Sequence, residues 1–181
     1  MKARVHEAEG QSWYAASYEA VKRRFTDAEL YVDLLALTSA RASVAANVTL
    51  ATKAYRQIKA TGSVTRDGFC RHHHSSLLHY LETGEIRGRK TASFAECLRN
   101  PASQRVPVDI WMMRWHGLDH DVPTRREYDE IESRILREAE EHGMSPRDYQ
   151  SKVWMDTRGD GYRARGSSFA DYLMQDVLLP E

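Results

Sequence analysis

TDAELYVDLLALTSA, residues 26–40, decides the fold class because its pattern is that of a buried α-helix. Leucines recur at positions 30, 34, 35 and 37, a spacing that places them on one side of a helix. Thr26 followed by Glu29 predicts a capping box at the start of this helix. Patterns of the same kind follow along most of the chain, so the sequence favours an all-α protein.

Proline and a second capping box mark the starts of other expected helices. Pro107 is placed to begin the helix that contains Asp109, and Ser145 followed by Pro146 indicates a further helix start. Thr124 followed by Glu127 predicts a capping box at the start of a long amphipathic helix. Because no β-strand alternation of useful length occurs, we expect one all-α domain over residues 1–181, a compact globular bundle of about eight or nine helices. The helical patterns cover residues 26–40, 44–58, 76–84, 90–98, 107–115, 124–139, 147–156 and 167–179.

Charge is balanced over the whole chain and unevenly distributed along it. The chain carries 26 basic and 26 acidic residues, so its formal net charge is zero. A neutral chain does not coat nucleic acid through bulk electrostatics alone, which gives the local clusters more weight. Basic clusters occur at residues 22–24, 87–90 and 158–166, whereas residues 124–142 are acidic overall. A polyanion should bind at the basic clusters, although each cluster alone is also typical of an ordinary solvated surface.

The chain lacks the sequence features of a secreted or membrane protein. Two cysteines, Cys70 and Cys97, are too few for a disulfide framework or for an iron–sulfur cluster of their own. No uncharged apolar run approaches the roughly 18 residues that a membrane span requires, and the first residues lack the apolar stretch of a signal peptide. We therefore expect a cytoplasmic monomer with reduced thiols and no membrane contact.

Two stretches hold metal-binding residue types, and neither predicts a metal site. In FCRHHHSSLLH, residues 69–79, three consecutive histidines cannot all face one ion on a regular helix. In residues 156–167, an arginine and a serine occupy positions where a calcium-binding loop has ligands. We expect no metal and no cofactor, and predict instead that Arg158, Arg163 and Arg165 contact phosphate.

Three stretches, in this order, resemble segments of the helix-hairpin-helix (HhH-GPD) superfamily of DNA glycosylases. They are LLALTSARASVAANVTLATKAY (34–55), GRKTASFAECL (88–98) and VPVDIWMMRW (106–115). The separation between Lys90 and Asp109 is similar to that in the lysine-bearing members. The resemblance implies an all-helical fold, double-stranded DNA as the partner, and chemistry on a base that is flipped out of the duplex.

The resemblance also assigns roles to individual residues. Cleavage of an N-glycosidic bond develops positive charge on the sugar, and a fixed carboxylate in a water-poor site, here Asp109, stabilises that charge. A lysine can instead attack the sugar and form an imine, which leads to strand scission. Lys90 is the candidate, and Arg87 and Arg89 beside it favour its neutral form. Arg41 stands where relatives place a side chain that fills the gap left by the flipped base.

The stretch around Gly88 resembles the second half of the family's hairpin, which presents backbone N–H groups and a helix N-terminus to a phosphate. We expect Arg87, Gly88 and Arg89 to contact DNA there. The stretch departs from the family pattern, because Ile86 stands where the hairpin has its first glycine. An alternative alignment matches residues 88–98 to an earlier helix of the family, in which case the hairpin is deleted and the lysine is structural.

Trp111, two residues after Asp109, is expected to read the flipped base, whereas Trp115 and Trp154 are expected in the core. The leading prediction is therefore a DNA N-glycosylase, a hydrolase of base-excision DNA repair, with AP lyase activity if Lys90 reacts, acting on nucleoid DNA. One alternative is an enzyme of phage or bacterial DNA base hypermodification on the same scaffold. Another is a helical DNA-binding module without chemistry, in which Asp109 only caps its helix.

Overall fold

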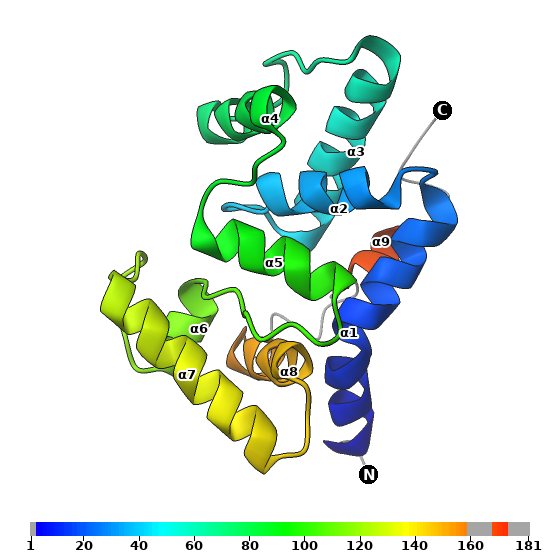
Figure 1. Ribbon diagram of the computed structural model, residues 1–181. Coiled ribbons are helices and arrows are strands. Elements are labelled where there is room, and N and C mark those ends of the chain that lie inside the picture. Colours follow the sequence, from blue (N-terminus) through cyan, green and yellow to red (C-terminus); the bar gives the residue numbers. More distant parts are fainter. Residues whose placement is uncertain (1–2, 159–167, 174–181) are drawn as a thin grey trace.

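Helices make up the whole regular structure of the part of the chain that the computed structural model describes, residues 3–158 and 168–173. Those residues form nine α-helices and no β-strand (Figure 1), which confirms the all-α fold class. The helices are α1 (Ala3–Arg24), α2 (Ala28–Leu37), α3 (Val44–Thr61), α4 (Arg71–Thr83), α5 (Arg89–Arg99), α6 (Ile110–Trp115), α7 (Arg125–Glu141), α8 (Pro146–Arg158) and α9 (Phe169–Leu173).

The stretch 26–40 does form a buried helix, α2, but the capping box predicted at its start is wrong. The N-cap residue is Asp27, whose side chain accepts a hydrogen bond from a backbone N–H of the first turn at 3.2 Å. The Thr26 hydroxyl lies 3.1 Å from the hydroxyl of Tyr55 on α3 instead. Glu29 is drawn away from the cap by an ion pair with Arg99, at 3.0 Å. Thr26 and Asp27 are both residue types that can cap α2. Because Thr26 and Glu29 have contacts with other helices, Asp27 acts as the cap.

Helix starts further along the chain agree with the sequence in two cases and differ in one. The capping box of Thr124 and Glu127 is present at the start of α7. Helix α8 begins at Pro146, as the preceding serine and this proline indicate. The helix expected to begin at Pro107 begins instead at Ile110, because Asp109 has an extended backbone and acts as its N-cap.

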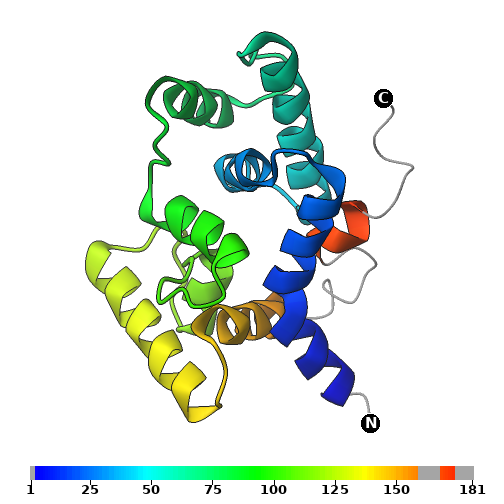
Figure 2. The ribbon, with the colours of Figure 1, turned by 45° about the vertical axis from the view of Figure 1, so that its right-hand side comes forward.

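Buried side chains form two hydrophobic clusters, one in each half of the molecule (Figures 1 and 2). The larger cluster draws on α1 to α5, on α9 and on Met155 of α8, and includes Tyr31, Leu34 and Leu77. The smaller cluster joins residues 106–108 to α6, α7 and α8. Trp154 on α8 packs against both clusters, so it stands at the junction between the halves.

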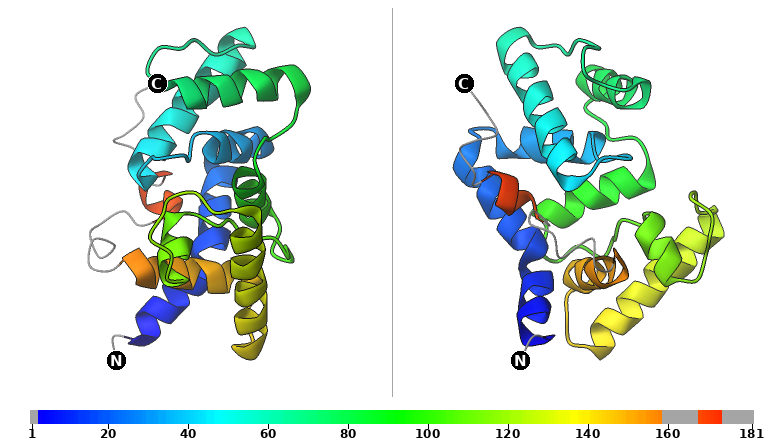
Figure 3. Two further views of the ribbon diagram at one scale, coloured as in Figure 1. Left: turned by 90° about the vertical axis from the view of Figure 1, so that its left-hand side faces the viewer. Right: turned by 180° about the vertical axis from the view of Figure 1, so that it is seen from behind.

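Helix α1 runs along both halves and closes one side of that junction (Figure 3). It packs against α8 in one half and against α2, α5 and α9 in the other. The sequence did not single out this segment as a helix, and the structure places two aromatic side chains from it, Trp13 and Tyr14, in the interior. Of the helix expected over residues 167–179, the part beyond Leu173 lies outside the described residues.

Candidate active site

A cavity of about 100 Å³ lies where the two halves of the molecule meet. Its walls come from segments that are far apart in the sequence: α1, the turn between α2 and α3, α3, α5, residues 107–109, α8 and α9. Apolar cavities of roughly 150 Å³ accept a single aromatic ring, so this space is no larger than one ring requires. The lining residues are Trp13, Tyr14, Ser39, Ala42, Ser43, Val44, Asn47, Lys90, Phe94, Pro107, Asp109, Gln150, Ser151, Trp154 and Phe169.

Asp109 is held in one orientation by hydrogen bonds to both of its carboxylate oxygens. Its Oδ1 accepts from the backbone N–H groups of Trp111, at 3.0 Å, and Met112, at 3.1 Å. Its Oδ2 accepts from Nε1 of Trp154, at 2.8 Å. The carboxylate is therefore both the N-cap of α6 and a fixed, half-buried negative charge in the cavity wall.

The segment that carries Asp109 is extended because a side chain from α7 occupies its backbone hydrogen-bonding groups. The hydroxyl of Tyr128 donates to the carbonyl of Val106 at 2.9 Å and accepts from the N–H of Val108 at 3.2 Å. Burial raises the pKa of Tyr128, so the phenol keeps the proton that it donates. This clamp fixes the chain immediately before the cap.

Lys90 lies in the first turn of α5 and lines the same cavity. The helix is entered through Gly88, whose φ of 89° favours glycine. No residue within the described ranges gives the Lys90 ammonium a hydrogen bond or an ion pair, the carboxylate of Asp109 included. The cavity therefore holds a fixed carboxylate and a half-buried lysine whose donors are unused.

The two arginines beside Lys90 have different surroundings. The guanidinium of Arg89 pairs with Asp129 and Glu132 on α7, and it stacks 4.1 Å from the ring centre of Tyr128. Its charge is balanced there, so the phosphate contact expected of Arg89 would have to displace two carboxylates. Arg87 is exposed and has no side-chain partner in the described part of the chain, which leaves it open to a phosphate.

Arg41 occupies the turn between α2 and α3, three of whose neighbouring residues line the cavity. It is exposed, and it is the one non-glycine residue of the described chain with a positive φ, 56°. A left-handed backbone at an arginine costs of the order of 1 kcal/mol and persists where tertiary contacts enforce it. One such contact comes from α4, where Nε2 of His73 lies 2.8 Å from the carbonyl oxygen of Ala40.

Five aromatic side chains from α1, α5, α8 and α9 form the apolar walls. Trp13 lies at their centre, with ring centroids 5.3 Å from Phe169 and 5.9 Å from Trp154. The other two, Tyr14 and Phe94, have ring centroids 6.3 Å apart. Sequence patterns alone do not group these residues, because α1, α5 and the pair α8 and α9 lie far apart in the chain.

The tryptophan that reaches Asp109 is not the one that the sequence favoured. Trp111 is 36% exposed on α6 and does not line the cavity, so its predicted contact with a flipped base has no support from this geometry. Trp154, expected in the core, lines the cavity and donates to Asp109. The guanidinium of Arg158 lies 4.4 Å from the Trp154 ring centre, while Arg163 and Arg165 lie outside the described residues.

Most polar side chains of the cavity wall form hydrogen bonds within the protein. The hydroxyl of Tyr14 donates to Oε1 of Gln150 at 2.7 Å, and Nε2 of Gln150 reaches the carbonyl of Pro107 at 3.4 Å. Burial raises the pKa of Tyr14, which keeps it a neutral donor. Thr38 holds one end of the Asn47 amide at 2.7 Å. The groups left to meet a ligand are chiefly Lys90 and Asp109.

A family model, described as a family of unknown function (DUF7178), matches residues 2–161. The chain belongs to this family. A comparison of the chain with curated proteins and with solved structures found no match. The matched residues include every residue that lines the cavity except Phe169.

Two further properties bear on what could bind. Over the described ranges, no group of three or more histidine, cysteine, aspartate or glutamate side chains is arranged to hold a metal ion. Within the same ranges, no helix is at once long and apolar enough to span a bilayer. The groups that line the cavity include a carboxylate, an amine and aromatic rings.

Proposed function

We propose that this protein is a DNA glycosylase that receives a flipped base in the cavity and cleaves its N-glycosidic bond. One observation carries the proposal. Asp109, Lys90 and the turn of Arg41, which lie in three separate stretches of sequence, meet at a single aromatic-walled cavity. These parts suit a glycosylase: a fixed carboxylate for the charge that develops on the sugar, an aromatic-walled space for the base, and an amine that offers a second nucleophile.

The proposed hydrolysis assigns the central role to Asp109. As the bond between C1′ and the base nitrogen breaks, its electron pair leaves with the base and positive charge develops on the sugar. The Asp109 carboxylate, fixed by three N–H donors, faces that charge without needing to reorganise. Water then bonds to C1′, and its proton passes to the departing base.

Lys90 offers a second nucleophile for the same carbon. In its neutral form the amine can bond to C1′ as the base leaves with its electron pair, and an amine proton passes to the base. The C1′–O4′ bond of the sugar ring then opens to give an imine, which promotes elimination of the 3′ phosphate. In its charged form it can only bind or orient the substrate. Borohydride reduction separates these cases, because it traps the imine as a covalent protein–DNA adduct.

The aromatic walls suit the planar faces of a nucleobase. Base and aromatic ring stack with a gain of about 1 to 3 kcal/mol for each base in other nucleic-acid-binding proteins. Because the space is no larger than one ring requires, we expect altered pyrimidines to enter it more readily than altered purines.

A panel of duplexes, each with one altered base, tests the proposal directly. The protein is incubated with each duplex, and mass spectrometry then detects free base and abasic DNA. Release of free base from at least one duplex supports the proposal. A nucleotide that changes mass and keeps its base would favour the alternative reaction, base modification on the same scaffold.

One observation favours a second candidate, a DNA-binding module without chemistry. Asp109 does cap α6, and capping alone is a sufficient structural reason for an aspartate there. That candidate predicts DNA binding with no change in the mass of any base. It leaves the half-buried, unpaired Lys90 unexplained.

A further inference from the structure

The outer face of α4 carries a shallow hollow, separate from the cavity, that the proposed chemistry does not use. Three arginines surround it, with one carboxylate, that of Glu82, among them. We call it the α4 hollow. It is lined by Arg66, Arg71, His74, Ser75, Leu78, His79, Glu82 and Arg87.

The arginines of the α4 hollow outnumber its one carboxylate, that of Glu82, and none of them forms an ion pair in the described part of the chain. Arg66, Arg71 and Arg87 are all exposed, and none has a side-chain hydrogen bond or ion pair within residues 13–158 and 168–173. Many arginines elsewhere are paired: Arg99 with Asp33 and Glu29, Arg114 with Asp121, Arg126 with Glu130, and Arg134 with Glu138.

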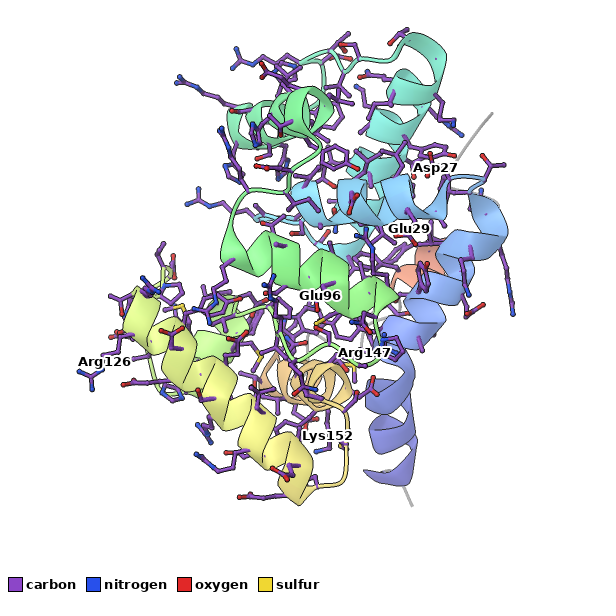
Figure 4. All side chains as sticks on the ribbon, in the orientation of Figure 1. Asp27, Glu29, Glu96, Arg126, Arg147 and Lys152 are labelled. Atoms are coloured by element: carbon purple, nitrogen blue, oxygen red, sulfur yellow. The ribbon has the colours of Figure 1, made fainter. Side chains whose placement is uncertain are left out.

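A hollow on α7 makes the contrast clear. Four arginines line it, more than line the α4 hollow. Arg126, labelled in Figure 4, pairs with Glu130 at 2.8 Å, and Arg134 pairs with a carboxylate of the next helical turn at 2.7 Å. Arg137 lies 4.0 Å from Glu141. The α7 hollow is therefore close to neutral, whereas the α4 hollow is positive in a chain of zero net charge.

The α4 hollow and the wall of the cavity are connected by a short link of the chain. Arg87, in its wall, belongs to the short link between α4 and α5 and precedes Lys90 by three residues. On α4 itself, His73 contacts Ala40, next to Arg41. Figure 1 shows α4 and α5 joined by this link. One extended polyanion can therefore reach the hollow and the cavity together.

We propose that the α4 hollow binds the sugar–phosphate backbone of duplex DNA next to the nucleotide whose base enters the cavity. The inference rests on the proposed function and adds a second contact region to it. Guanidinium groups without protein partners can each form paired hydrogen bonds to phosphate oxygens. Such contacts position the duplex and carry no sequence information, which suits a surface remote from the base.

The test uses the double variant Arg66→Gln/Arg71→Gln of the full chain, with a duplex whose altered base the wild-type protein releases. Two lost phosphate contacts should reduce the magnitude of the log–log salt slope of affinity by about 1.8, at about 0.9 per phosphate. We expect Kd at about 0.1 M salt to rise roughly tenfold. The single-turnover rate at saturating DNA should stay unchanged, because neither arginine lines the cavity.

The matched control is Arg125→Gln/Arg137→Gln, which removes two exposed positive charges from α7. It should change the salt slope and Kd far less, and thermal unfolding should show that both double variants remain folded. A wild-type slope and Kd in Arg66→Gln/Arg71→Gln would overturn the inference and leave the proposed function standing if base release persists. A wild-type protein that neither binds DNA nor releases a base would overturn both.

Discussion

Two aspartates cap helices in this protein, and their surroundings differ. Asp27, at the surface end of α2 (Figure 4), accepts one backbone N–H and lies 4.0 Å from the ammonium of Lys59. Asp109, at the start of α6, accepts two backbone N–H groups and the indole N–H of Trp154, and it lines the cavity. Both perform the same local task, so capping cannot distinguish a structural aspartate from a reactive one. The difference lies in what else meets the carboxylate.

Removal of each carboxylate should give the largest contrast. Asp27→Ala should lower the free energy of unfolding by about 1 kcal/mol, because it loses a cap. Asp109→Ala should lower it by about 1 kcal/mol more, because the indole N–H of Trp154 also loses its acceptor. Only Asp109→Ala should slow single-turnover base release, by a factor of about a thousand. Denaturant titration and quenched single-turnover assays measure the two effects. Comparable activity in the two variants would remove Asp109 from the chemistry.

Two lysines, Lys90 and Lys53, can be compared in the same way. Lys90 lines the cavity without a partner, whereas Lys53 is bound to Asp67 at 3.0 Å. If Lys90 attacks C1′, borohydride should trap a covalent adduct with wild type and with Lys53→Ala, and none with Lys90→Ala. Electrophoresis under denaturing conditions reports the adduct. Base release without any trapped adduct would make the reaction a simple hydrolysis.

The indole that orients Asp109 should matter less than the carboxylate itself. Trp154→Phe keeps the aromatic wall and removes the N–H that donates to Asp109, so we expect a loss of roughly tenfold in single-turnover rate. Trp115→Phe is the control, because both rings lie beneath an arginine and only Trp154 contacts the carboxylate. Equal rates in the two variants would show that the indole does not position Asp109.

The carboxylate of Glu138 does not line the cavity and, among the described residues, contacts only Tyr149 and neighbouring arginines. Its replacement should therefore change stability alone, with the smallest effect of these four predictions. Burial opposes its ionisation, but hydrogen bonds from Tyr149 and Arg134 outweigh burial and lower its pKa. Its contribution to stability is therefore complete above the ordinary glutamate pKa of about 4.3 and is lost as the pH falls through the lower folded-state pKa. Glu138→Gln should flatten the acid side of the stability curve, measured by thermal unfolding from pH 3 to 6. An unchanged acid limb would contradict this account of the contact.

The sequence predicted the helices better than it predicted the site. Leucine spacing at 30–37 and the capping box at 124–127 are local signals, and both correspond to helices. Thr26 failed as a cap because two neighbouring residues could serve and distant partners decided between them. Pro107 failed as a helix start because Tyr128, far along the chain, holds that segment extended.

Some residues of the site could be predicted from the sequence, and others are brought together only by the packing of distant helices. Resemblance to known segments selected Arg41, Lys90 and Asp109. In the fold, Lys90 and Asp109 line one cavity, together with residues of the turn that contains Arg41. The aromatic wall could not be predicted, because Trp13 and Trp154 meet only when α1 packs against α8. Sequence proximity to Asp109 favoured Trp111 for contact with a flipped base, whereas helix packing brings Trp154 to the cavity and to the carboxylate.

The most direct test of the central claim compares Asp109→Asn with Asp27→Asn in single-turnover base release. Asparagine and aspartate are nearly equal as N-caps, so both variants should fold, with a further loss of about 1 kcal/mol in Asp109→Asn where an amide N–H₂ faces the indole N–H. We predict that Asp27→Asn releases base at the wild-type rate and that Asp109→Asn, folded and still bound to DNA, is slower by about a hundredfold or more. Wild-type rates in both would show that the carboxylate of Asp109 only caps its helix and would contradict the glycosylase mechanism.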